Sequence, residues 1–239
     1  MGLKNKYTVR SIDNYIALEW IKKKHYAKRS PCMQYTFGLF DLEKKELNGV
    51  LVFSPAPSRF WNNGGKLFND KHIINVHELS RLVLNDGHEK NLTSFFVSRC
   101  LNLMPKPNVI ISYADTNNNH AGYIYQATNF IYTGLAQPQN KSMDFILFGK
   151  KYHGRNMNIE FTRKKLGVKY NEDLHWKQNI IESGGQIIKQ LPKHRYIYIN
   201  SKNKKQLIID LSYKLQPYPK TENINYDASF KPAQQKTLF

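Results

Sequence analysis

Cysteine and long apolar runs are the first features that this sequence lacks. Cys32 and Cys100 are its two cysteines, and they form no Cys-x-x-C pair. A framework of several disulfides is therefore excluded, and both thiols are expected to be reduced, as is usual inside a cell. No apolar run approaches the roughly 20 residues that cross a bilayer, and the first residues lack the apolar stretch of a signal peptide. We therefore expect a cytoplasmic protein that does not insert into a membrane.

Acidic residues are also scarce. The chain has 18 Asp and Glu against 36 Lys and Arg, which gives a formal net charge of +18. Self-repulsion of this size opposes the compact state, and an anionic partner is the usual compensation. Nucleic acid is the first candidate, an anionic membrane the second, and a merely basic surface the third. The chain is still 41% hydrophobic and 13% aromatic, so it can bury a core.

Several motifs with well-defined chemistry are missing. The sequence has no H-E-x-x-H, Walker loop, G-x-G-x-x-G or G-x-S-x-G, and its eight histidines do not fall into a zinc spacing. The Cys/His signature of the zinc base deaminases is absent too. Any catalysis must therefore use residues outside these signatures.

The apolar pattern predicts an α/β fold with a mixed sheet. Residues 35–39 and 49–53 read as two strands of an antiparallel hairpin. Residues 54–59 are expected to form a loop, because Pro55 and Pro57 lack the N–H that a strand needs. The other expected elements are helices at 12–24, 91–104 and 122–129, and strands at 76–84, 109–113, 131–135 and 145–148.

The character of the sequence changes near residue 150. Basic residues and turn formers then dominate, the strand-like segment 196–199 is isolated, and the end looks unfolded. We therefore expect a catalytic domain over residues 1–150 and a basic extension over 151–220 that completes it and contacts nucleic acid. A flexible tail is expected over 221–239.

Two polar residues near the expected buried strand 109–113 are candidates for catalysis. Asp115 follows the strand directly, at the edge where open α/β sheets bind ligands. Tyr125 lies in the next helix and can fold back to the same edge. The alternative is that Asp115 caps the following helix and that Tyr125 is half-buried packing.

Two basic residues are further candidates. Arg81 lies inside an apolar strand, where its guanidinium needs a carboxylate or a phosphate, so a salt bridge and a substrate clamp are equally supported. His25, next to Tyr26 in a basic loop, is a candidate base or metal ligand. The alternative is an ordinary surface histidine.

Several segments together resemble a known family. They are residues 111–115, the run 120–134 with its Tyr-Gln-Ala-Thr-Asn, His25-Tyr26 followed by Arg29-Ser30, Gly49-Val50 leading into Ser54-Pro55-Ala56, and Glu78-Leu79-Ser80-Arg81-Leu82. Over roughly residues 15–200 the chain resembles the Mom proteins of Mu-like phages. The resemblance implies an acetyltransferase-like (GNAT) fold, which the expected order of elements fits independently. It also implies a transferase that converts adenine in DNA to N6-carbamoylmethyladenine, which blocks host restriction enzymes, in the host cytoplasm.

The resemblance also implies site residues. The family's important positions fall on His25, Tyr26, Arg81, Asp115 and Tyr125, all of which match in type. We further expect the acyl donor to be bound by Ser54, Ser80 and Asn91. Nucleic acid is expected to be bound by a set of basic residues, which are Arg29, Arg59, Lys193, His194 and Arg195. As an alternative to acid–base roles, a metal such as iron would find nitrogen and oxygen ligands in His25, Tyr26, Asp115 and Tyr125.

The acyl donor stays open between acetyl-CoA and glycyl-tRNA. The usual coenzyme A loop, Gln/Arg-x-x-Gly-x-Gly/Ala, is not matched by residues 82–89, and an acetyl group lacks the nitrogen of the product. A glycyl group supplies every atom. In this hypothesis Asp115 takes a proton from the adenine amine, Tyr125 donates to the oxyanion, and Arg81 holds a phosphate or braces Asp115.

The target adenine must leave the base stack for its amine to be reached. Tyr113, Tyr123 and Phe60-Trp61 are candidates to hold the extruded base, or are ordinary core aromatics. The competing functions are a non-enzymatic basic nucleic-acid-binding module and a GNAT-type acyltransferase that acts on another nucleic acid, such as tRNA.

The end of the chain carries one more resemblance. Gln235-Lys236-Thr237-Leu238-Phe239 is similar to the Gln-x-x-Leu-Phe peptide by which many bacterial proteins dock on the replicative sliding clamp. Such a tether would raise the local concentration of DNA. The alternative is that Leu238 and Phe239 pack on the enzyme's own core.

Overall fold

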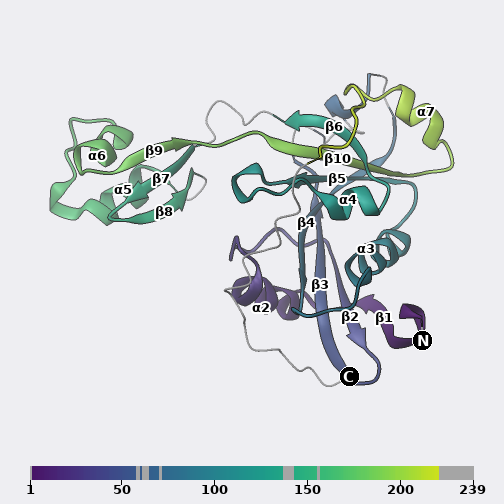
Figure 1. Cartoon of the computed structure of the whole chain (residues 1–239). Coiled ribbons are helices and arrows are strands. Elements are labelled where there is room, and N and C mark those ends of the chain that lie inside the picture. Colours follow the sequence, from purple (N-terminus) through teal and green to yellow (C-terminus); the bar gives the residue numbers. More distant parts are fainter. Residues whose placement is uncertain are drawn as a thin grey trace. The chain divides into compact units, whose positions relative to one another are not determined.

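The computed structural model describes residues 2–57, 60, 65–69, 72–136, 143–154 and 157–220, and it divides into two compact units (Figure 1). The sheet unit consists of Met1–Ala114, His120–Gly134 and His194–Phe239, and the inserted unit of Asp115–Asn119 and Leu135–Lys193. The inserted unit interrupts the chain between two strands that are neighbours in the large sheet.

A seven-stranded mixed sheet forms the sheet unit. Its order is β1-β2-β3-β4-β5-β10-β6, in which β4 and β5 are parallel and the pairs from β1 to β4 and between β5 and β10 are antiparallel. The strands are β1 (Tyr7–Ser11), β2 (Tyr35–Asp41), β3 (Glu46–Pro55), β4 (Asn75–Leu84), β5 (Asn108–Ala114), β10 (Lys193–Asn200) and β6 (Ile131–Ala136).

The parallel strands β4 and β5 separate partway along their length. They pair from Asn75 with Asn108 to Glu78 with Ile111, and no further. Figure 1 shows the consequence, since β2, β3 and β4 run in one direction and β5, β10 and β6 in another. Beyond the last pair, the Ser112 hydroxyl of β5 donates a hydrogen bond to the Leu79 carbonyl oxygen of β4 at 2.9 Å. The separation leaves the polar Ser112 of β5 buried beside the end of its pairing with β4.

Helices cover both faces of this sheet. The buried side of α2 carries Ala17, Trp20 and Ile21, all fully buried against β2, β3 and β4. On the other face, α3 buries Leu92, Phe96, Val97, Cys100 and Leu101. The helices of the sheet unit are α1 (Leu3–Lys6), α2 (Asn14–Lys24), η2 (Gly65–Leu67), α3 (Leu92–Leu103), α4 (Tyr123–Ala127) and α7 (Lys204–Ile209).

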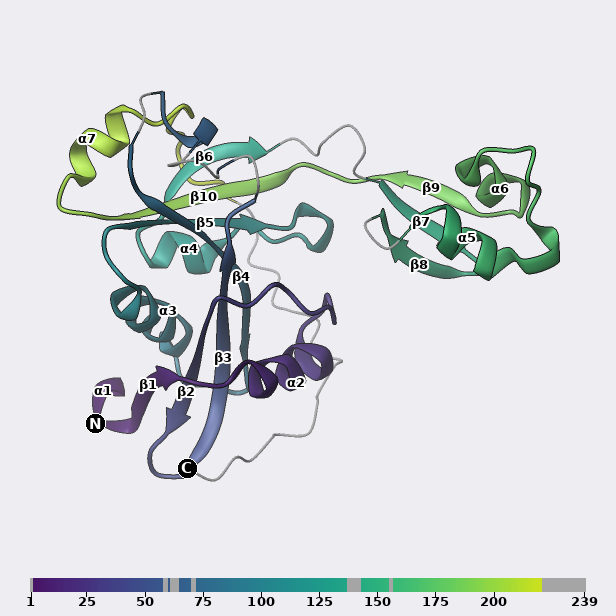
Figure 2. The same ribbon diagram turned by 180° about the vertical axis from the view of Figure 1, so that it is seen from behind.

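The inserted unit has a sheet and a core of its own (Figure 2). Phe145, Leu147, Met157, Leu166 and Ile180 form that core. The strands, in the order β8-β7-β9, are β8 (Lys150–His153), β7 (Met143–Leu147) and β9 (Gln186–Lys189). Its helices are η3 (Thr116–Asn118), α5 (Ile159–Leu166), η5 (Gly167–Lys169) and α6 (Trp176–Glu182).

The predicted α/β class with a mixed sheet is confirmed, and so is the hairpin of β2 and β3. Two expectations were wrong. Ser54 and Pro55 belong to β3, because a proline is tolerated at the end of a strand. Residues 196–199 are not isolated, since β10 pairs with β5 along seven residues. The functional division at residues 150 and 220 stays a prediction, and the predicted tail lies outside the described residues. Among the described helices none has the length and apolar character needed to cross a membrane.

Candidate active site

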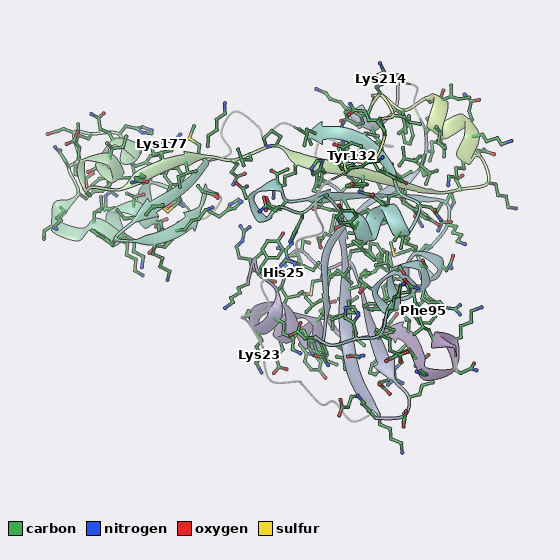
Figure 3. All side chains as sticks on the ribbon, in the orientation of Figure 1. Lys23, His25, Phe95, Tyr132, Lys177 and Lys214 are labelled. Carbon is green, nitrogen blue, oxygen red and sulfur yellow. The ribbon has the colours of Figure 1, made fainter. Side chains whose placement is uncertain are left out.

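The loop after α2 places His25 and Tyr26 side by side. His25 follows the last residue of α2 (Figure 3) and is 6% exposed, while Tyr26 is 45% exposed. Their rings stack with centroids 4.4 Å apart, and the rings of Tyr26 and His120 are nearly perpendicular, with centroids 5.7 Å apart. The structure therefore brings two predicted site residues together and adds His120 to them.

His25 is held in one tautomer. Its Nδ1 accepts a hydrogen bond from the backbone N–H of Ala27 at 3.0 Å, so that nitrogen carries the lone pair and the neutral ring has its proton on Nε2. Burial, followed by the charges of Arg81, His120 and Arg29, lowers the pKa of His25 to about 3. At neutral pH His25 is therefore an uncharged hydrogen-bond donor through Nε2.

This buried neutral ring predicts a pH dependence of stability. The pKa of His25 is lower in the folded chain than in the unfolded one, so the unfolded state binds the extra proton as the pH falls below about 6.5. The free energy of unfolding should fall by about 2 kcal/mol between pH 7 and pH 5 through this residue alone. Denaturant unfolding at both pH values should show the loss in the wild type and a smaller loss in His25→Gln. An equal loss in both proteins would contradict the assignment.

Arg81 links β4 to the loop after α2. Its Nη1 donates to the Ser80 carbonyl oxygen at 2.6 Å, and its Nη2 to the Arg29 carbonyl oxygen at 3.4 Å. The guanidinium also contributes to the low pKa of His25. Arg81 therefore holds the basic loop and adds to the burial that keeps His25 neutral.

Tyr125 lies in α4 and faces the buried Ser112 of β5. Its ring packs on Phe130 and Tyr196, with centroids 5.3 and 5.2 Å away, and the Ser112 side chain lies close enough to affect its pKa. Burial raises the pKa of Tyr125, as does the charge of Glu78, whereas Ser112 lowers it, and the net shift is upward. Tyr125 is therefore a neutral hydroxyl group at neutral pH and suits hydrogen-bond donation.

Backbone and side-chain packing fix the position of α4. Gly122 has a φ of 76°, and a Cβ there would lie 2.5 Å from the Tyr196 ring, so only glycine fits. Gln126 donates to the Tyr196 hydroxyl at 3.2 Å and to the Ala121 carbonyl oxygen at 3.3 Å. These contacts anchor α4, and with it Tyr125, to β10.

Asp115 follows β5 directly and belongs to the inserted unit. Its Oδ1 accepts from the backbone and side-chain nitrogens of Asn117, both at 3.1 Å, and its Oδ2 lies 3.3 Å from the Lys193 ammonium. Burial acts to raise the pKa of Asp115, but Lys193 and Asn117 outweigh it and lower the pKa below its ordinary value. Asp115 is thus an ionised carboxylate that caps η3, as the alternative interpretation expected, and its catalytic role stays a prediction.

Two of the predicted donor-binding residues meet across β3 and β4. The Ser54 hydroxyl donates to the Ser80 hydroxyl at 2.6 Å, and Ser80 donates to the Val52 carbonyl oxygen at 3.2 Å. Asn91 is exposed and precedes α3 in the left-handed conformation, with a φ of 67°. Its carbonyl oxygen accepts from the Phe95 N–H and the Ser94 hydroxyl, at 3.0 and 2.9 Å, within the first turn of α3.

The residues predicted to contact nucleic acid occupy different environments. Lys193 pairs with Asp115, and the Nδ1 of His194 lies 2.8 Å from the Tyr132 hydroxyl. Arg195 is 8% exposed, donates to the Thr133 hydroxyl and carbonyl oxygens at 2.8 and 3.0 Å, and lies over the Tyr213 ring at 3.4 Å. A guanidinium enclosed in this way does not reach a phosphate, so Arg195 does not belong among the DNA contacts.

Other predicted residues fall elsewhere. Arg29 is half-buried, and its carbonyl oxygen accepts from Arg81. Arg59, Trp61, Gln235, Leu238 and Phe239 lie outside the described residues. Ser112 and His120 lie in the segments that carry the family resemblance, but they were not predicted as site residues. No local pattern in the sequence shows that Ser112 lies near Tyr125 or that His120 contacts Tyr26.

Neither proposed cofactor finds a good fit. Asp86 and Glu89 precede α3, where the pyrophosphate of coenzyme A would need an anion-binding helix start, and Glu89 is bound to Lys6 at 2.9 Å. For iron, a His25 ligand bound through Nε2 would need its proton on Nδ1, which faces the Ala27 N–H. In the described part of the chain no group of three or more His, Cys, Asp or Glu residues gathers as a metal site.

Comparisons with known proteins place these residues in context. The model of the Mom protein family matches residues 6–220. The methylcarbamoylase mom of Escherichia phage Mu is 29% identical over 218 residues, which cover 89% of this chain and 83% of that protein.

Among solved structures, a ribosomal-protein-S5-alanine acetyltransferase from Vibrio fischeri is 13% identical, with a TM-score of 0.43 over 82% of this chain and 94% of that one. A mutant spermidine N-acetyltransferase from Vibrio cholerae is 10% identical, with a TM-score of 0.45 over 84% and 98%. Scores below 0.5 do not establish a shared fold.

Proposed function

The chain belongs to the Mom protein family, and from this membership and the site we propose that it transfers a glycine-derived group to the amino group of adenine in double-stranded DNA. The observation that carries the proposal is the neutral Tyr125, packed in the core of the sheet unit close to Ser112, beside the point where β4 and β5 separate. Both residues lie in the segment that the family model matches, and a neutral tyrosine there suits a donor to an oxyanion.

We propose glycyl-tRNA as the donor, because its atoms account for the product without any oxidant or reductant. The adenine N6 attacks the glycyl ester carbonyl, and the 3′-hydroxyl of the tRNA leaves with a proton. The free glycyl amine then attacks C6 of the ring through a five-membered intermediate, and the original C6–N6 bond breaks. The original N6 becomes the amide nitrogen of N6-carbamoylmethyladenine. Since coenzyme A and iron do not fit the residues, no step depends on either.

The predicted residues take separate roles in this proposal. Asp115, which is ionised, accepts the proton that the amine loses. Tyr125 donates to the oxyanion of the tetrahedral intermediate, and His25 offers a second neutral donor through Nε2. Arg81 and Tyr26 position His25.

We propose that exposed lysines of the inserted unit contact the phosphates of DNA, or of the tRNA donor. Lys164, Lys165 and Lys169 are exposed near the end of α5 and in η5. The acidic Glu172 nearby is already bound by Arg163, at 2.6 and 2.8 Å. The field around the three lysines is therefore positive, which favours contacts to the backbone rather than to bases.

Replacing Lys164, Lys165 and Lys169 by glutamine should reduce the salt dependence of DNA binding. If each lysine contacts one phosphate, the slope of log K against log salt should fall in magnitude by about 2.7. Fluorescence anisotropy of a labelled duplex at several salt concentrations measures the slope. The matched control removes the same charge from the sheet unit through Lys22, Lys44 and Lys45→Gln. Equal slopes in the two triple variants would place the DNA surface elsewhere.

The tail and the place of action complete the proposal. The peptide Gln235–Phe239 would dock on the bacterial sliding clamp and direct modification to new strands, in the cytoplasm of the host cell. Binding of a peptide of residues 235–239 to purified clamp tests this part without involving the enzyme.

Mass analysis of DNA from cells that express the protein tests the main proposal. Adenosine should gain one carbamoylmethyl unit, and fragmentation should locate it on the amino nitrogen. Label from glycine, but not from acetate, should enter that unit. Unchanged adenosine would favour a non-enzymatic nucleic-acid-binding module, and label from acetate would rule out the glycyl donor.

A further inference from the structure

The turn between β7 and β8 holds a phenylalanine in a strained backbone conformation. Leu147 pairs with Lys150, so Phe148 and Gly149 form a two-residue hairpin loop. Both have positive φ, 51° and 71°. Such turns favour asparagine, aspartate or glycine at the first position, because a bulky side chain in the left-handed region crowds its own backbone. Folding alone gives no reason for a phenylalanine there.

Packing of the Phe148 side chain does not compensate for this backbone strain. It is 59% exposed, whereas its neighbours Phe145 and Leu147 are 2% and 0% exposed in the core of the inserted unit. A Cβ built on Gly149 would meet nothing within 4 Å, so the tip of the turn projects into open space. Strain and an exposed aromatic ring at one position are typical of a residue kept for binding.

The charges around the turn match DNA. Lys150 and Lys151 follow it and are both exposed, and the Lys151 ammonium lies 3.1 Å from the buried Asp144. Since Lys151 is paired with Asp144, Lys150 is the cation next to the turn, and an apolar side chain beside it fits a base step at a phosphate backbone, where the ring stacks on bases and the Lys150 ammonium meets a phosphate.

We infer that Phe148 is a wedge that enters the base stack of duplex DNA and holds a base step open. The inference rests on the proposed function, in which the target adenine must leave the stack before its amine can react. Phe148 unstacks the base step, and the proposed phosphate contacts of Lys164, Lys165 and Lys169 provide affinity for the DNA. Phe148 therefore acts on the DNA substrate without taking part in bond making or breaking.

Phe148→Asn separates binding from folding, because Asn-Gly is a favoured sequence for this turn. The variant should melt about 4 °C higher than the wild type. In duplexes that carry 2-aminopurine at successive positions, the fluorescence rise seen with wild-type protein should drop at least about five-fold. The salt slope of binding should not change, because no cation is lost. Phe148→Trp should retain the signal.

Ile181→Asn is the matched control, because Ile181 is an exposed apolar residue of α6 in the same unit, away in sequence from the three proposed phosphate-binding lysines. It should leave the fluorescence signal unchanged. A 2-aminopurine signal from Phe148→Asn as large as that of the wild type would contradict the wedge proposal, and so would a lower melting temperature of the variant. A change of oligomeric state in Phe148→Asn would also contradict it, because the ring would then belong to a contact between protein chains. Adenine modification by the wild type is measured on the same duplexes. Its absence would remove the proposed function but not the wedge, and its presence without a Phe148-dependent signal would remove the wedge alone.

Discussion

Replacing Tyr125 by phenylalanine is expected to slow adenine modification by about 100- to 1,000-fold, which is the effect of removing one donor to an oxyanion. The hydroxyl is the group that changes, because the ring keeps its packing on Phe130 and Tyr196. The raised pKa of Tyr125 keeps that hydroxyl protonated at neutral pH in the wild type. DNA binding and the melting temperature should therefore stay close to those of the wild type while the rate falls.

Tyr132→Phe is the matched control for this substitution. Tyr132 lies against the same Tyr196 ring, at 5.1 Å, and its hydroxyl is bonded to His194 at 2.8 Å. Removing it deletes a comparable hydroxyl from the same aromatic cluster, so a purely structural effect would appear in both variants. The rate should be measured by mass analysis of a defined duplex in single-turnover conditions. A Tyr125→Phe enzyme as fast as Tyr132→Phe would remove Tyr125 from the catalytic residues.

The sequence predicted those elements whose pattern is local. The strand at 76–84 and the helix at 91–104 appear as β4 and α3 within one residue at each end, because their apolar residues alone determine period and length. The strand β10 could not be recognised in this way. Its partner β5 precedes it by about 80 residues, so its place inside the sheet depends on pairing that no local pattern records. Its flanking lysines and histidine made it look like a surface segment.

The same distinction separates the site residues that could be predicted from those that could not. The types and neighbours of His25 and Tyr26 could be read directly, but the tautomer of His25 depends on how the loop folds back so that Ala27 donates to Nδ1. Arg195 sits among basic residues, which suggested phosphate contacts. Its burial depends on Thr133 and Tyr213, which only the folded chain brings to it. Charge patterning predicts partners for a surface, and it fails for a cation enclosed by remote segments.

Asp115→Asn is the second substitution with a large expected effect, a loss of about 100- to 10,000-fold in the rate of modification. The amide oxygen can still accept from Asn117, so the cap of η3 survives, but an amide cannot take up a proton. The lowered pKa of Asp115 makes it a weak base. A weak base suffices here, because the amine becomes strongly acidic once it has attacked the ester carbonyl. The carboxylate then receives a proton that leaves readily.

Asp144→Asn tests whether the loss is specific to this carboxylate. Asp144 is also an aspartate of the inserted unit with a lysine partner, Lys151 at 3.1 Å, and a lowered pKa, but it does not follow β5. Its substitution should leave the rate nearly unchanged.

Lys193→Gln should raise the pKa of Asp115 by removing the charge that lowers it, and the acid limb of the pH profile of the rate should move to higher pH. An acid limb that stays in place in Lys193→Gln would show that a different group accepts the proton.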